Sequence, residues 1–191
     1  MKKVLLLHVM LLVAGFGVVQ AQIQRGNVLV GADIANFQLG LREGNHFEML
    51  INPKVAWFIE DNVALGGFFD VGIDTDKGEG SDFTYGVGAL GRYYTGPASA
   101  PIKHTRFFAE ANVGIQGYNP RVGDNTNGLG IGIGPGIAYF ITPNIGLEGL
   151  FKYNGIIGFG QAATNHLLSL NVGFQVYLPG RTVKAAIENV K

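Results

Sequence analysis

The stretch Gly128-Leu-Gly-Ile-Gly-Ile-Gly134 alternates strictly between glycine and a bulky aliphatic residue. Side chains of a β-strand point to opposite faces in turn, so this pattern predicts a strand with one apolar face and one bare face. The same two-residue period runs through residues 63–74 and 167–178. A nucleotide-binding glycine loop is excluded here, because such a loop needs irregular spacing and a following helix.

The same alternation, on both sides of this stretch, divides most of the chain into strands separated by turn-rich segments. The connections are too short to hold crossover helices, so neighbouring strands must pair antiparallel. An even number of such strands closes naturally into an up-and-down barrel. The predicted strands are eight: 26–37, 46–58, 63–74, 83–94, 106–118, 128–140, 145–154 and 166–178.

An internal repeat supports this division of the chain. Residues 53–67 align with residues 135–149 without a gap, and both copies read as strand, tight turn and strand. Each copy begins with a proline, Pro53 or Pro135, which cannot donate a hydrogen bond to a sheet. We therefore expect a β-bulge at both prolines and leave the strand register there open.

Composition narrows the classes of protein. Hydrophobic residues make up 47% of the 191 residues and charged residues 15%, which excludes a disordered chain. Lys plus Arg equals Asp plus Glu, at 14 each, so nothing favours nucleic acid as a partner. The absence of cysteine excludes disulfides, a thiolate nucleophile and a cysteine metal site.

The first 21 residues have the pattern of a cleaved signal peptide. Lys2 and Lys3 precede an apolar run over 4–19, and Val19-Gln20-Ala21 offers a cleavage site. The apolar run is shorter than the roughly 20 residues that a membrane-spanning helix needs. We expect residues 22–178 to form the barrel and residues 179–191 a short periplasmic tail. Its residues fit a short amphipathic helix or a frayed end equally well.

The small, polar face of the strands carries about one charge per strand among many glycines. That is too little charge for a surface in water, but it suits a narrow interior filled by a few paired ionic side chains. We therefore expect an interior ionic network that plugs the barrel and leaves no continuous water channel. Its predicted members are Glu48, Lys54, Asp70, Arg92, Glu110, Glu148 and Lys152; Asp33 lies on the same face.

The bulky apolar face must then point outward. A strand of about 12 residues, tilted by about 45°, rises about 28 Å, close to the apolar band of an outer membrane. Aromatic residues gather near the strand ends, as in the interfacial girdles of membrane barrels. The predicted fold is therefore all-β, an eight-stranded antiparallel up-and-down transmembrane β-barrel.

Several stretches resemble the small bacterial outer-membrane β-barrel family, of the OmpA/OmpX type. They are residues 25–31, 58–66, 88–94 (Gly-Ala-Leu-Gly-Arg-Tyr-Tyr) and 108–114 (Phe-Ala-Glu-Ala-Asn-Val-Gly). The resemblance covers nearly all of 25–178 and is specific for fold rather than activity. It implies a monomer in the outer membrane of a Gram-negative bacterium, with membrane lipid and the barrel-assembly machinery as partners. The chain departs from the family by continuing after its last strand.

The sequence predicts no catalytic residue, metal site or cofactor. Residues 74–82 alternate carboxylates but miss the calcium-loop template, because Lys77 stands where an oxygen ligand is needed. His166 and Ser169 fall on opposite faces of their strand, which disfavours a Ser-His-acid site. The predicted role is structural or surface-interacting, through external loops near 38–45, 75–82, 119–127 and 155–165, where an external ligand would bind. Two alternatives stay open: a soluble periplasmic ligand-binding barrel and a lipid-modifying outer-membrane enzyme.

Overall fold

The computed structural model describes residues 23–39, 47–76, 80–96, 104–123, 125–159 and 165–180. The side chains of 35–39, 47, 76 and 165 are not described. The predicted signal peptide and all but the first two residues of the predicted tail lie outside these ranges. Within the described ranges, no helix is long and apolar enough to cross a membrane.

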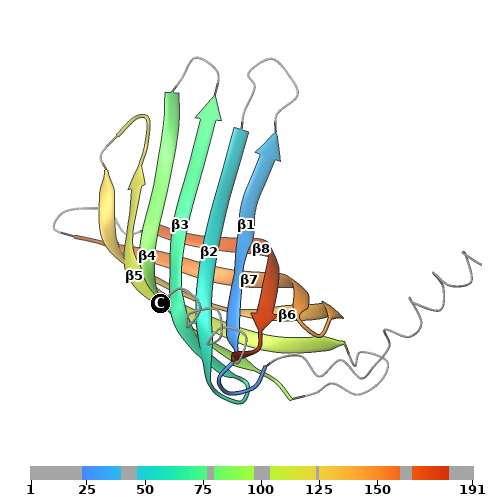
Figure 1. Cartoon of the computed structure of the whole chain (residues 1–191). Coiled ribbons are helices and arrows are strands. Elements are labelled where there is room, and N and C mark those ends of the chain that lie inside the picture. Colours follow the sequence, from blue (N-terminus) through green and yellow to red (C-terminus); the bar gives the residue numbers. More distant parts are fainter. Residues whose placement is uncertain are drawn as a thin grey trace, which may run out of the picture.

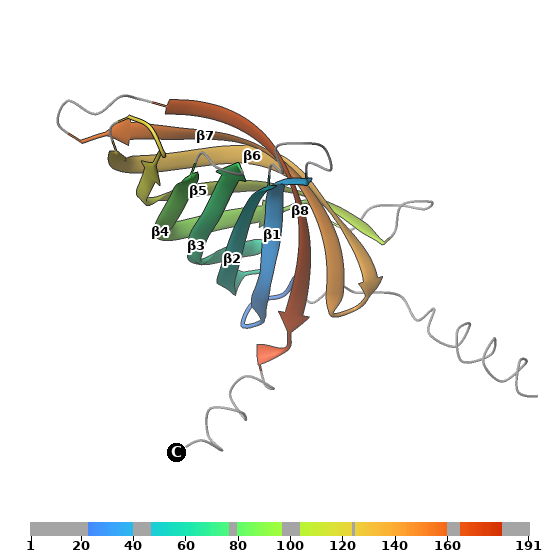
Figure 2. The ribbon, with the colours of Figure 1, turned by 90° about the horizontal axis from the view of Figure 1, so that it is seen from above.

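Eight strands form one closed antiparallel barrel in which each strand pairs with its neighbours in sequence (Figure 1). The prediction of an eight-stranded up-and-down barrel is confirmed. The last strand pairs with the first, and the two lie side by side when the barrel is viewed from above (Figure 2). The strands are β1 (Val28–Leu39), β2 (Phe47–Glu60), β3 (Val63–Asp76), β4 (Gly80–Tyr94), β5 (Thr105–Asn119), β6 (Thr126–Thr142), β7 (Ile145–Gly158) and β8 (Asn165–Leu178).

Every predicted strand exists, but three of the four predicted outer loops are shorter than expected. Strands β3 and β4 continue until Asp76 pairs with Gly80. Strand β6 already begins at Thr126, and β7 runs on to Gly158. We call the end of the barrel with these hairpins the loop end, and the opposite end, where Ile23 and Gly180 lie, the terminal end.

The expected bulges at the two prolines are wrong. Pro53 pairs with Ala32 and Pro135 pairs with Ala109, and the register is continuous through both. A strand has two hydrogen-bonding edges, so a proline can lose one bond on one edge without shifting the register. Within the two copies of the repeat, the register shifts lie instead between Phe58 and Glu60 and between Phe140 and Thr142, which are equivalent places.

The two faces of the wall are segregated as the alternation predicts. The interior holds a cluster that includes Phe58, Phe68, Tyr94, Phe108, Phe140 and Tyr177. Large apolar side chains point outward on every strand; examples are Ile34, Trp57, Leu65, Phe69, Val71, Val87, Ile115, Leu129, Ile131, Leu147, Leu170 and Val172. The fold therefore has an apolar outside and a mixed polar and aromatic inside, the reverse of a barrel in water.

The closing seam between β1 and β8 is paired over only part of its length. The pairs run from Val28 with Leu178 to Ala35 with Asn171. Beyond them, toward the loop end, residues 36–39 and 165–170 have no described pairing with each other. The two strands therefore diverge at the loop end of the seam.

Candidate functional site

Glu110, on β5, is the centre of an ionic network inside the barrel. Its carboxylate accepts hydrogen bonds from Arg92 Nε at 2.6 Å, Lys54 Nζ at 3.0 Å and Lys152 Nζ at 3.2 Å. These partners come from β4, β2 and β7, so Glu110 links strands around the barrel wall. All four side chains are nearly inaccessible to solvent.

Two further carboxylates complete the network. Asp33 Oδ2 accepts a bond from Lys54 Nζ at 2.5 Å, and Glu148 Oε2 accepts one from Arg92 Nη1 at 2.7 Å. Three acids thus face three bases. Because each of these six charges has an opposite partner and the six balance, the large desolvation cost of each ion is offset locally.

Aromatic side chains fill the interior between this network and the terminal end. The Tyr177 hydroxyl donates to Glu148 at 2.5 Å, and Tyr94 accepts from Arg92 at 3.0 Å. The Arg92 guanidinium lies 4.5 Å from the centre of the Phe108 ring, within range of a cation–π interaction. We call the buried side chains of Phe58, Phe68, Tyr94, Phe108, Phe140 and Tyr177 the aromatic plug.

The other two residues predicted for the network lie elsewhere. Asp70 accepts bonds from the side-chain amides of Asn52 and Gln116, the latter at 2.6 Å. Glu48 lies nearer the loop end, beside Asp70 on the wall of a cavity. The structure therefore brings together Lys54, Arg92, Glu110, Glu148 and Lys152, and adds Asp33. Asn52 and Gln116, which sequence reasoning did not single out, share the inward parity of their strands.

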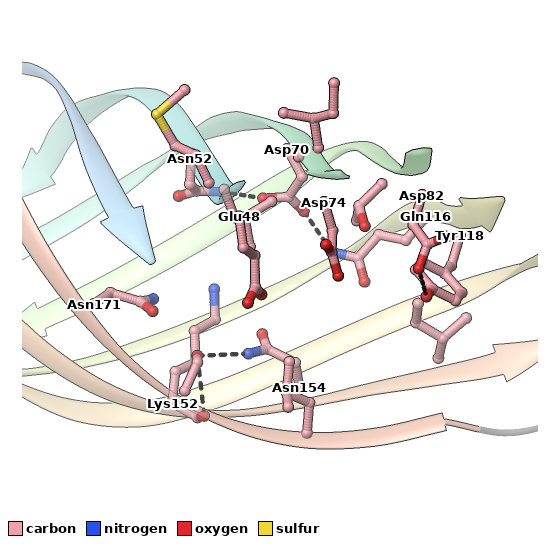
Figure 3. Close-up of a pocket in the computed structure, with 18 residues that line it drawn as sticks. Glu48, Asn52, Asp70, Asp74, Asp82, Gln116, Tyr118, Lys152, Asn154 and Asn171 are labelled. Carbon is pink, nitrogen blue, oxygen red and sulfur yellow. Dashed lines mark hydrogen bonds between the residues drawn. The ribbon is translucent and has the colours of Figure 1, made fainter. Parts of the chain in front are cut away.

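The cavity of about 280 Å³ occupies the loop-end half of the interior (Figure 3). Figure 3 shows Asp70 with its amide partners on one wall and Lys152 and Asn171 on other strands. Apolar residues such as Leu50 and Ile156 also line it. Buried aromatic side chains therefore lie toward the terminal end of the interior, and the cavity lies toward the loop end.

A cluster of hydrogen bonds crosses the rim of this cavity. Asp82 lies one residue nearer the loop end than the outward-facing Phe83. It accepts bonds from the backbone amide of Arg121 at 2.6 Å and from the Tyr118 hydroxyl at 2.7 Å. Arg121 also contacts Asp74 at 3.3 Å. The Arg121 backbone bond, followed by the Tyr118 bond, lowers the pKa of Asp82 below its ordinary value of 3.8. These contacts tie the loop after β5 to the β3–β4 hairpin.

Neither of the other chemical candidates forms a site in the described residues. His166 is exposed and contacts the Tyr153 hydroxyl at 2.5 Å, whereas Ser169 is buried on the inner face. Asp74 and Asp82 pair across the β3–β4 ladder and are engaged by Arg121. Among the described residues, no group of three or more His, Cys, Asp or Glu is placed to hold a metal ion.

The strand number, the closed antiparallel topology and the segregated faces are those of the OmpA/OmpX-type eight-stranded barrel fold. No protein-family model matches the chain, and no curated protein matches it.

Among solved structures, the chain is similar to Neisserial surface protein A, with 19% identity, 80% of this chain and 96% of that chain covered, and a TM-score of 0.48. It is similar to the N-terminal β-barrel domain of Pseudomonas aeruginosa OprF, with 19% identity, coverages of 79% and 98%, and a TM-score of 0.47. It is also similar to the outer membrane enzyme PagL, with 17% identity, coverages of 78% and 98%, and a TM-score of 0.46. These likenesses say nothing about activity, ligand or partner.

Proposed function

We propose that the mature chain is a non-enzymatic outer-membrane barrel of a Gram-negative bacterium that serves as a structural scaffold for its outer loops. The observation that carries this proposal is the apolar exterior. Side chains such as Phe69, Leu170 and Val172 are more than half exposed on the outer face. In water, a continuous apolar surface around a whole barrel would drive aggregation, whereas in a bilayer it meets hydrocarbon.

The height of this exterior supports the same environment. On β3, outward apolar side chains run from Val63 to Ile73, interrupted only by Gly67. Ten residue steps of about 3.3 Å, tilted by 35–45°, rise about 23–27 Å. That range includes the roughly 25 Å apolar band of an outer membrane. Trp57, Tyr93, Phe107 and Tyr139 are exposed near the terminal end, where an interfacial girdle would lie.

The interior supports a scaffold rather than a pore. The balanced network around Glu110 and the aromatic plug around Tyr177 together close the terminal half of the barrel. Eight strands leave an interior that side chains can fill. We propose that interactions with an external ligand use the loop-end hairpins, and that lipid and the barrel-assembly machinery are the partners of the monomeric chain.

The two alternatives have less support from the geometry. A soluble ligand-binding barrel needs its aliphatic face inside, but Leu65, Leu129 and Leu170 point outward. A lipid-modifying enzyme needs a nucleophile near a histidine, and the described contact of His166 is with Tyr153.

Fractionation tests the proposal. We expect the processed protein in the outer-membrane fraction, beginning at Gln22, with a gel mobility that changes on heating. The variant Leu170→Arg places a charge on the outer face and should reduce the amount of folded barrel in the outer-membrane fraction. Recovery of the wild-type protein in the soluble periplasmic fraction would contradict the proposal.

A further inference from the structure

The loop-end cavity contains a buried carboxylate whose described partners are all neutral. Asp70 is 9% exposed, and its carboxylate accepts bonds from the amides of Asn52 and Gln116. No described Lys or Arg forms an ion pair with it. A buried carboxylate usually has a cationic partner, because amide donors alone offset little of the cost of removing the charge from water.

The neighbouring cationic side chains are already paired with other carboxylates. Lys152 lines the same cavity, but its Nζ donates to Glu110 Oε1 at 3.2 Å. Lys54 and Arg92 are held by Asp33, Glu110 and Glu148 in a network whose charges balance. Asp70 therefore adds one negative charge to the cavity. None of the three network bases compensates this charge. At the rim, Arg121 is likewise engaged, by Asp74 and Asp82.

A second, independent feature of the cavity is an unused hydrogen-bond acceptor. Asn171, on β8, is 6% exposed and lines the cavity, and its Oδ1 has no hydrogen-bond partner among the residues that the structure describes. Leaving such a buried acceptor unpaired is unfavourable, because it loses its hydrogen bonds to water and gains none in the protein. Figure 3 shows Asn171 on a different wall from Asp70. The cavity thus combines a negative charge with a free acceptor.

The remaining lining limits the size and polarity of an occupant. Leu50, Ile156 and Leu167 give the cavity apolar surface. Its volume of about 280 Å³ corresponds to about nine water molecules at roughly 30 Å³ each. A multivalent metal ion would need several carboxylates together, and the described residues contain no such group. The fitting occupant is therefore small, partly apolar and cationic.

We propose that this cavity binds a small primary ammonium compound with a short apolar chain. The three N–H donors of an ammonium group match the acceptors that the cavity presents, with Asp70 supplying the charge and Asn171 the free oxygen. The apolar chain lies against Leu50 and Ile156. The proposal goes beyond the scaffold role. Binding depends only on the folded barrel, whatever surrounds it. The ammonium site can therefore be absent from a protein that lies in the outer membrane, and it can be present in one that does not.

Titration calorimetry on the folded full-length mature barrel in a non-ionic detergent tests the proposal, with n-butylammonium chloride as the probe. Identical titrations into detergent alone remove the heat of partitioning. We expect saturable binding of n-butylammonium, and none of n-butanol or butyrate at the same concentrations, because both lack the cationic donor group.

Three variants locate the binding. Asp70→Asn should weaken binding about tenfold or more, and Asn171→Ala should weaken it severalfold. The control Glu60→Gln removes an equally charged group from the exposed terminal end, outside the cavity, and should bind as the wild type does. Heat-modifiable gel mobility checks that each variant is folded, and the Asn171 variant decides the matter if the Asp70 variant does not fold. Equal binding of n-butanol, or unchanged binding by the cavity variants, would overturn the proposal.

Discussion

The substitution Glu110→Gln removes the carboxylate that three cations share. In the wild type, the interior network holds three acids and three bases, and Glu110 contacts Arg92, Lys54 and Lys152. The variant leaves one excess positive charge. Arg92 keeps Glu148 at 2.7 Å and Lys54 keeps Asp33 at 2.5 Å, so the cation without an ionic partner is Lys152.

The loss of stability follows from the charge of Lys152, which the variant leaves without an ionic partner. Removing one partner of a buried ion pair costs about 3–5 kcal/mol of stability. Lys152 lies on the cavity wall, where its ammonium group can regain some hydration, so we expect the lower end of this range, about 3 kcal/mol. The control Glu60→Gln breaks an exposed pair with Arg25 and should cost less than about 1 kcal/mol.

Equilibrium unfolding by guanidinium in detergent or lipid vesicles measures both values. Trp57 is the chain's single tryptophan and is 51% exposed on the outer face, so its fluorescence reports the transfer of the barrel wall to water. The double variant Glu110→Gln with Lys152→Met should recover most of the lost stability, because it removes the stranded charge. An unchanged unfolding midpoint for Glu110→Gln, or a double variant no more stable than the single one, would refute this account of the network.

Three further predictions follow from the exterior, the rim and the plug. Leu170→Arg should cost about 2–4 kcal/mol in the same unfolding assay in vesicles, and no loss would contradict lipid contact at this face. Because folding lowers the pKa of Asp82, its carboxylate adds stability above its ordinary pKa of 3.8, and this is lost as pH falls through the folded value. Asp82→Asn should therefore destabilise the barrel at pH 7 and have little effect near pH 2, whereas an equal effect at both would count against the rim contacts. Planar-bilayer recording of the purified barrel should show no large, stable conductance; such a conductance would mean that the plug opens.

The strands and their faces were predictable because both depend on a local pattern. The alternation around Ile131 or Leu170 fixes which side chains share a face, whatever the strand pairs with. The predicted bulges are wrong because the number of hydrogen bonds that a strand loses at Pro53 or Pro135 depends on which edge faces which neighbour. That information lies outside the strand itself.

The partners of the interior charges could not be predicted from the sequence, because they too depend on other strands. Lys54 and Glu110 are 56 positions apart, and they meet because the strands are staggered around the barrel. Asp70 is predicted to join the network, but the stagger of the strands places it nearer the loop end than Arg92, where its partners are amides. Parity shows that a charge points inward, whereas its height along the barrel depends on the whole closed sheet.

The incomplete seam bears on the order in which the barrel forms. Every other strand pair is a hairpin between neighbours in sequence, but Val28 and Leu178, which pair across the seam, are 150 positions apart. Loop closure over so long a stretch carries the largest entropy cost in the molecule, so this seam closes last. With 36–39 and 165–170 outside its described ladder, its loop-end part is also held by the fewest cross-strand bonds. Amide exchange should then begin there and spread along β1 and β8 toward the terminal end, so that the barrel unfolds in the reverse of the order in which it closed.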